Sequence, residues 1–131
     1  MTLDSDKVIV NASKSEIIDF LKDANNLIHL LPQDNISDFK SDETQCSFKV
    51  QGGIIISLIE NGFEENKLFL KAGEKSPFPF DLTVDLTDVE SGTEGFIHFD
   101  GKVNMFLKMM VEKPLGNLFN YMSKKLKEKF Q

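Results

Sequence analysis

Apolar and polar side chains alternate along most of residues 36–103, which is the pattern of strands with one buried face. The clearest strand covers residues 80–87, where Phe80, Leu82, Val84 and Leu86 alternate with aspartate and threonine. The pattern predicts strands at residues 7–11, 36–40, 44–50, 54–58, 67–72, 80–87 and 95–102. Gly52-Gly53, Asn61-Gly62 and residues 90–93 around Gly92 are predicted turns, and residues 73–79 a loop.

Two short helices are predicted between the first and second strands. Ser13 is a favourable N-cap, and Glu16 stands three residues later, which predicts a capping box. Ile17, Phe20 and Leu21 follow with the spacing of a buried helical stripe. A second helix begins at Asp23, places Leu27, Ile28, Leu30 and Leu31 among its apolar residues, and ends before Pro32.

A long amphipathic helix is predicted over residues 105–131, which hold four of the five methionines. In its second half one apolar stripe consists of Leu115, Leu118, Phe119, Met122, Leu126 and Phe130. Residues 105–111 carry their apolar side chains on roughly the opposite side, so a straight helix cannot bury both sets against one sheet. Pro114 removes a backbone hydrogen bond, and we therefore expect a break or kink near residues 113–116.

These elements predict one α+β domain over residues 1–131. Consecutive strands joined by short connections form an antiparallel sheet, here of about six to seven strands. One face of the sheet must be covered, and the terminal helix is the only predicted element that is long enough to cover it.

The pattern resembles the START-like superfamily (the SRPBCC group), which includes birch-pollen-allergen-like and polyketide cyclase/dehydratase-like proteins. Residues 8–13 leading into residues 16–21 carry the resemblance, together with Asn26-Leu27, Leu31-Pro32 and the closing helix. The resemblance implies a helix-grip fold, in which a curved antiparallel sheet grips the C-terminal helix with a cavity between them. The superfamily has no shared catalytic residues, so it assigns none here.

Composition narrows the classes of function. The net charge is −6, and all 15 basic residues are lysine. Nucleic acid is an unfavourable partner, because the recognition of phosphate and guanine depends strongly on arginine. No apolar run is long enough for a transmembrane helix, and the acidic start does not resemble a signal peptide. With Cys46 as the single cysteine, we expect a cytoplasmic protein without disulfides or a cysteine-based zinc site.

Few residues are candidates for catalysis or for binding a metal. His98 and Asp100 share one face of a strand and form a candidate acid/base pair. Ile97 and Phe99 are expected to point into the interior from the other face, so we expect His98 to face solvent. Two separate histidines do not make a metal site, and we expect neither a metal nor another cofactor. Lysines cluster near residue 125, where they complement the helix dipole or contact an anionic membrane; we favour the first interpretation and expect no stable membrane insertion.

We expect non-catalytic binding of a small apolar or amphipathic molecule between sheet and helix. The predicted wall consists of Cys46, Phe48, Ile56, Leu58, Leu70, Leu82, Val84, Ile97, Phe99, Leu118, Phe119 and Met122. Two alternatives remain open: a cyclase- or dehydratase-like enzyme using His98 or an aspartate, and a protein-interaction module akin to the chaperone-activating branch of the superfamily. Residues 105–111 are predicted to be covered by the two short helices, or else to form a mobile cavity mouth or a homodimer contact.

Overall fold

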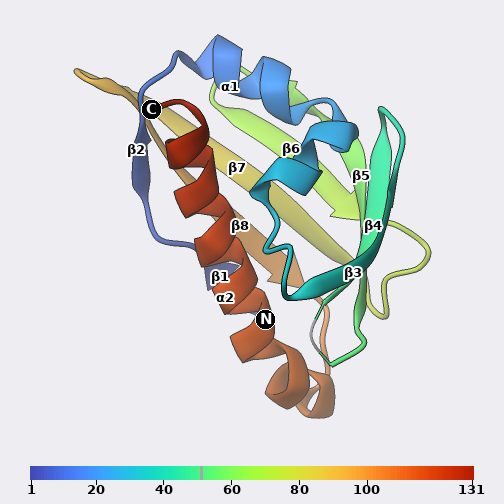
Figure 1. The fold of residues 1–131 in the computed structure, drawn as a ribbon. Helices are drawn as coiled ribbons and strands as arrows, with labels where there is room; N and C mark the ends of the chain where they lie inside the picture. The colour runs from blue at the N-terminus through green and yellow to red at the C-terminus, as the bar shows by residue number, and fades with distance from the viewer. Residues whose placement is uncertain (51) are drawn as a thin grey trace.

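A curved antiparallel sheet wraps around the long C-terminal helix in the computed structural model, which describes residues 1–50 and 52–131 (Figure 1). The strands follow the order β1-β8-β7-β6-β5-β4-β3, and β2 also pairs with β8. Their bounds are β1 Thr2–Asp4, β2 Val8–Val10, β3 Ile36–Ser41, β4 Gln45–Val50, β5 Ile55–Glu64, β6 Lys67–Ala72, β7 Phe80–Val89 and β8 Gly92–Gly101.

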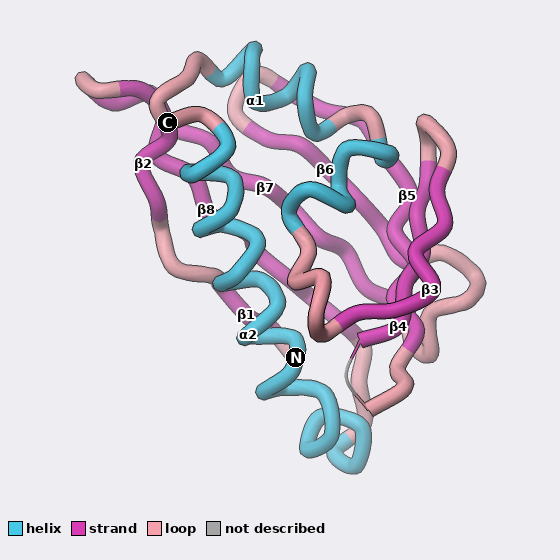
Figure 2. The backbone as a smooth tube through the Cα atoms, in the orientation of Figure 1, coloured by secondary structure: helices cyan, strands magenta, loops and turns pink. Residues whose placement is uncertain are grey.

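The helices lie on one side of this sheet (Figure 2). The α-helix α1 (Lys14–Leu21) and the 3-10 helix η1 (Ala24–Leu30) connect β2 with β3, and the long helix α2 (Met105–Lys129) ends the chain. Helix α2 packs against β8, β1, β2 and η1. Its predicted stripe is confirmed, because Leu115, Leu118, Phe119, Met122 and Leu126 are buried and Phe130 is partly buried.

The short helices begin where the sequence predicts. The Ser13 hydroxyl accepts a hydrogen bond from the Glu16 backbone N–H, and the Glu16 carboxylate accepts one from the Ser13 N–H, which completes the capping box. The Asp23 side chain caps η1, and Leu31 leaves helical geometry just before Pro32. Ile17, Leu21, Leu27 and Leu30 are buried, so both helices turn apolar side chains toward the sheet.

The sequence pattern missed one strand and misplaced one turn. The structure has an eighth strand, β1, which pairs Thr2–Asp4 with the end of β8; its three residues are too few to show an alternating pattern. The turn predicted at Asn61-Gly62 does not occur, because β5 continues to Glu64 and the chain turns at Glu65-Asn66. Gly62 has a φ of 90°, and the pairing register with β6 shifts there, so this glycine serves an irregularity inside a strand.

The first turns of α2 are exposed. We expected a break or kink near Pro114. Helix α2 is continuous through Pro114, so there is no break, but Figure 2 shows a bend between the first turns and the rest of the helix. Of residues 105–111, Val111 is buried and Leu107 partly buried, whereas Met105, Phe106, Met109 and Met110 are exposed. The short helices therefore do not cover this apolar surface.

The capping box gives a direct test of the fold. Replacing Ser13 by alanine removes the acceptor for the Glu16 N–H, and we expect the free energy of unfolding to fall by about 1 kcal/mol. Urea unfolding followed by circular dichroism measures this change. Ser15→Ala is the matched control, since Ser15 is exposed within the same helix, and an equal loss in both variants would contradict the role of the cap.

Candidate functional site

A small apolar void lies between the sheet and the C-terminal half of α2. Its volume is about 20 Å³, which is about the space that one water molecule needs. Strands β6, β7 and β8 form its floor, and α1, η1 and α2 cover it. The lining residues are Val8, Leu21, Leu27, Leu30, Leu68, Leu70, Leu82, Val84, Gly95, Phe96, Ile97, Met122, Ser123 and Leu126.

The wall of the void is almost entirely hydrocarbon. Among the described residues that line it, Ser123 alone has a polar side chain, and its hydroxyl donates to the Asn120 carbonyl 3.1 Å away. That hydrogen bond stays within α2, so the hydroxyl is already satisfied. A molecule in this space would therefore be held by apolar contact, with little to fix its orientation.

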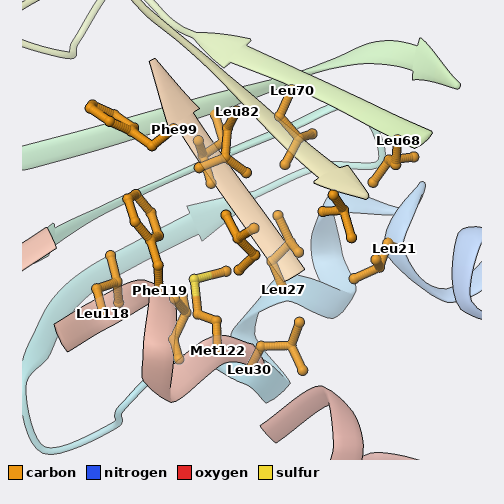
Figure 3. Packing of buried hydrophobic residues seen from close by; sticks show 14 of the residues in the cluster. Leu21, Leu27, Leu30, Leu68, Leu70, Leu82, Phe99, Leu118, Phe119 and Met122 are labelled. Atoms are coloured by element: carbon orange, nitrogen blue, oxygen red, sulfur yellow. The ribbon is translucent and has the colours of Figure 1, made fainter. Parts of the chain in front are cut away.

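The predicted wall residues are all buried, but the void brings only part of them together. Five line it: Leu70, Leu82, Val84, Ile97 and Met122. The other seven are packed elsewhere in the core: Cys46, Phe48, Ile56, Leu58, Phe99, Leu118 and Phe119. Figure 3 shows Met122 between Phe119 and Leu30, opposite the leucines of the sheet.

Phenylalanine rings fill the other part of the core. Phe99 lies at the centre of this cluster, with its ring centroid 5.4 Å from that of Phe119 and 5.2 Å from that of Phe80. Phe78 meets Phe99 edge to face at 6.3 Å. Offset and edge-to-face rings at these separations are well packed, so this part of the core is closed. The space near Leu27 and Leu30 is lined mainly by flexible aliphatic chains instead.

Sequence reasoning missed the roof of the void. Leu21, Leu27 and Leu30 come from α1 and η1, and their helical spacing marked them as buried without showing what they face. The contact between η1 and α2 places them over the sheet. Because that contact joins segments about ninety residues apart, no local pattern could reveal it.

A second pocket opens to the surface along α2. It has a volume of about 210 Å³ and lies between α2 and the segment from η1 to β4. Its lining residues are Pro32, Asn35, Ile36, Val50, Pro114, Asn117, Leu118 and Tyr121. Leu118 precedes Met122 by four residues, so the two side chains are neighbours on one face of α2. We call this pocket the mouth; Leu118 lines the mouth, and Met122 lines the void.

Other surface clefts are larger but have a different character. Two of them, of about 520 and 640 Å³, border the loop of residues 73–79. Both are open to solvent and mix charged side chains of either sign, such as Lys75 and Glu74 in the first, and Lys71 and Asp81 in the second. Charged side chains thus form part of both clefts, whereas none within the described part of the chain lines the void under α2.

The candidate chemical residues lie outside the void. His98 is on the outer face of β8, about a third exposed, and its Nδ1 contacts the carboxylate of Asp4 rather than the predicted Asp100. Asp4 belongs to β1, the strand that the sequence pattern did not reveal. Within residues 1–50 and 52–131, no group of three or more histidine, cysteine or acidic side chains is arranged to hold a metal. The same residues contain no helix that could span a membrane.

Cys46 is buried in β4, and burial raises the pKa of its thiol from an ordinary 9.0 to about 12. We expect Ellman's reagent to react far more slowly with the native protein than with protein unfolded in urea. Between pH 9 and 12 the unfolded thiol loses its proton before the native one, so this thiol makes stability fall as pH rises. Cys46→Ala should remove that component, and rapid native labelling would contradict the assignment.

Comparisons with known proteins support the fold. No model of a known protein family matches the sequence, and no curated protein matches it. Solved structures do match over almost the whole chain. One is a START superfamily protein from Mycobacterium smegmatis, with a TM-score of 0.73 and 17% identity over 98% of this chain and 96% of that one.

Two further structures are similar to the same extent. A protein from Thermus thermophilus has a TM-score of 0.74 and 14% identity, covering 99% of this chain and 97% of its own. The KanY protein has a TM-score of 0.75 and 14% identity, with the same coverage. At such low identity these likenesses establish the fold and nothing more. The chain has the START-like helix-grip fold.

Proposed function

We propose that this protein binds a small apolar or amphipathic molecule beneath the C-terminal half of α2, without chemical conversion. The observation behind this proposal is an apolar void lined by Met122, with Leu118 of the mouth four residues earlier on the same face of α2. Apolar contact surface is what drives such binding, at roughly 25 cal/mol per Å² buried. The START-like fold is compatible with this kind of site.

Binding requires side chains to move, because the void of about 20 Å³ is too small for an organic ligand. Met122 is the side chain best suited to move. It is unbranched, it lines the void, and it is the neighbour of Leu118, which lines the mouth, on the same face of α2. A ligand entering by the mouth would displace Met122 and occupy the space among Leu27, Leu30 and Leu82. The predicted site is therefore a closed one that a ligand opens.

The enzyme alternative finds little support. A cyclase- or dehydratase-like reaction needs an acid or base within hydrogen-bonding reach of the substrate. Of the described residues lining the void, none is acidic, basic or a histidine. His98 and Asp4 lie on the opposite face of the sheet, where they cannot reach a molecule under α2.

A series of straight-chain alcohols tests the proposal by displacing a bound environment-sensitive dye, anilinonaphthalene sulfonate. Each added CH₂ contributes roughly 0.8 kcal/mol, so affinity should rise about fourfold per carbon until the site is full and then level off. Met122→Trp should weaken binding of the dye at least tenfold, because the larger ring fills the void. The variant also introduces the first tryptophan of the chain, whose fluorescence reports its burial.

Three controls locate the binding. Phe106→Ser/Met109→Ser removes exposed apolar side chains of α2 and should leave displacement unchanged. His98→Ala should do the same, whereas a loss of binding in that variant would favour the enzyme. Phe63→Trp places a tryptophan at an exposed position and controls for the new ring. Equal dye binding by wild type and by a correctly folded Met122→Trp would rule out the internal site.

A further inference from the structure

Four large apolar side chains project from the first two turns of α2. Their exposed fractions are 72% for Met105, 71% for Phe106, 80% for Met109 and 50% for Met110. They are four of the six exposed large hydrophobic residues among those that the structure describes. Figure 1 shows these turns extending from the end of the sheet, away from the C-terminus. We call these four residues the apolar tip.

The exposure of the tip follows from regular helical geometry. The Asn104 side chain caps the helix by accepting a hydrogen bond from the Leu107 N–H at 2.9 Å. Val111 is fully buried, so one side of these turns is anchored to the protein. The four tip residues, spaced i, i+1, i+4 and i+5, then share the opposite, outward side. The tip is therefore an ordered surface on an anchored helix.

The segment that carries the tip differs in the sign of its net charge from the chain as a whole. Residues 102–113 contain Lys102, Lys108, Lys113 and one acidic residue, Glu112, giving a local net charge of +2 (three minus one). The whole chain has a net charge of −6. In a symmetric contact, the tip of a second copy would bring the same positive charge to the interface, whereas an anionic surface would meet the lysines directly. The charge pattern favours the anionic surface.

The size of the tip also favours an anionic surface over a second protein molecule. Taking about 200 Å² for each large side chain and the exposed fractions above, the tip offers roughly 500 Å² of apolar surface. A stable protein–protein interface buries about 800 Å² on each partner, so the tip alone is too small for one. Two exposed turns of methionine and phenylalanine are instead sufficient to enter the outer region of a bilayer, to a depth of about 5–10 Å.

We propose that the apolar tip docks the protein reversibly on anionic phospholipid bilayers. Phe106 and Met109 enter the boundary between headgroups and acyl chains, and the neighbouring lysines remain among the headgroups. Met110 lies one turn before Pro114, which lines the mouth, so docking places the mouth close to the lipid. Docking needs only lipid and does not depend on the proposed internal site.

Vesicle co-sedimentation tests this proposal with ligand-free protein. Wild type should bind phosphatidylcholine vesicles that contain phosphatidylserine, and should bind pure phosphatidylcholine at least tenfold more weakly. Phe106→Ser/Met109→Ser should lower the partition coefficient on the anionic vesicles at least tenfold. Phe63→Ser/Ile9→Ser is the matched control, because these side chains are 53% and 45% exposed elsewhere on the surface, and it should bind like wild type.

The lysines are tested separately. Lys102→Gln/Lys113→Gln should weaken binding to the anionic vesicles several-fold, and raising the salt concentration should have the same effect on wild type. Failure of wild type to bind the anionic vesicles would overturn the proposal, as would equal binding by wild type and Phe106→Ser/Met109→Ser. So would a wild-type dimer in sedimentation equilibrium that this double variant abolishes while vesicles bind neither protein. Dye displacement reports the internal site independently.

Discussion

The structure depends on α2 covering the concave face of the sheet. Strands β6, β7 and β8 present Leu68, Leu82 and Phe99 on that face, and an antiparallel sheet with one apolar face is stable only when this face is covered. Burying each large apolar side chain contributes about 1.5–3 kcal/mol. Helix α2 meets the sheet mainly along β8, β1 and β2, while η1 fills the space toward β4 and β5. The core is thus shared between two helical elements that come from opposite ends of the chain.

The interior is packed differently in the two regions of the core. Where α2 faces β8, the aromatic rings of Phe99 and Phe119 pack at a tilt with their centroids 5.4 Å apart and leave little space. The void lies where α2, η1 and the sheet all meet. There, leucine and methionine side chains must fill the space between three surfaces of different curvature. Close packing is hardest to achieve at such a junction, so it is also where a core can open at the lowest cost. The candidate site follows from the architecture rather than from any special residue.

The sequence predicts most of this fold because strand alternation and capping are local signals. The capping box at Ser13 and the strand from Phe80 match their patterns, since nothing distant alters them. The prediction fails at β1, where pairing with β8 determines the strand. It also fails at Gly62, where the glycine serves a shift of pairing register inside β5 rather than a turn. The wall of the void is only partly predicted by the sequence, because contacts between distant segments determine it. Burial of Cys46 and Phe48 follows from alternation, but which buried residues adjoin the void depends on how η1 packs on α2.

The two halves of α2 satisfy different constraints. After Pro114, the stripe from Leu115 to Leu126 is buried, and its sequence is the one that covering the sheet requires. Before Pro114, only Val111 is fully buried, so folding does not explain why Met105, Phe106, Met109 and Met110 are apolar. An exposed helix is more soluble with polar residues at such positions, and four large apolar residues concentrated in two turns lower solubility without stabilising the monomer. A surface of this kind is explained by a contact made outside the folded chain, and the lysines around it limit the surfaces it can meet.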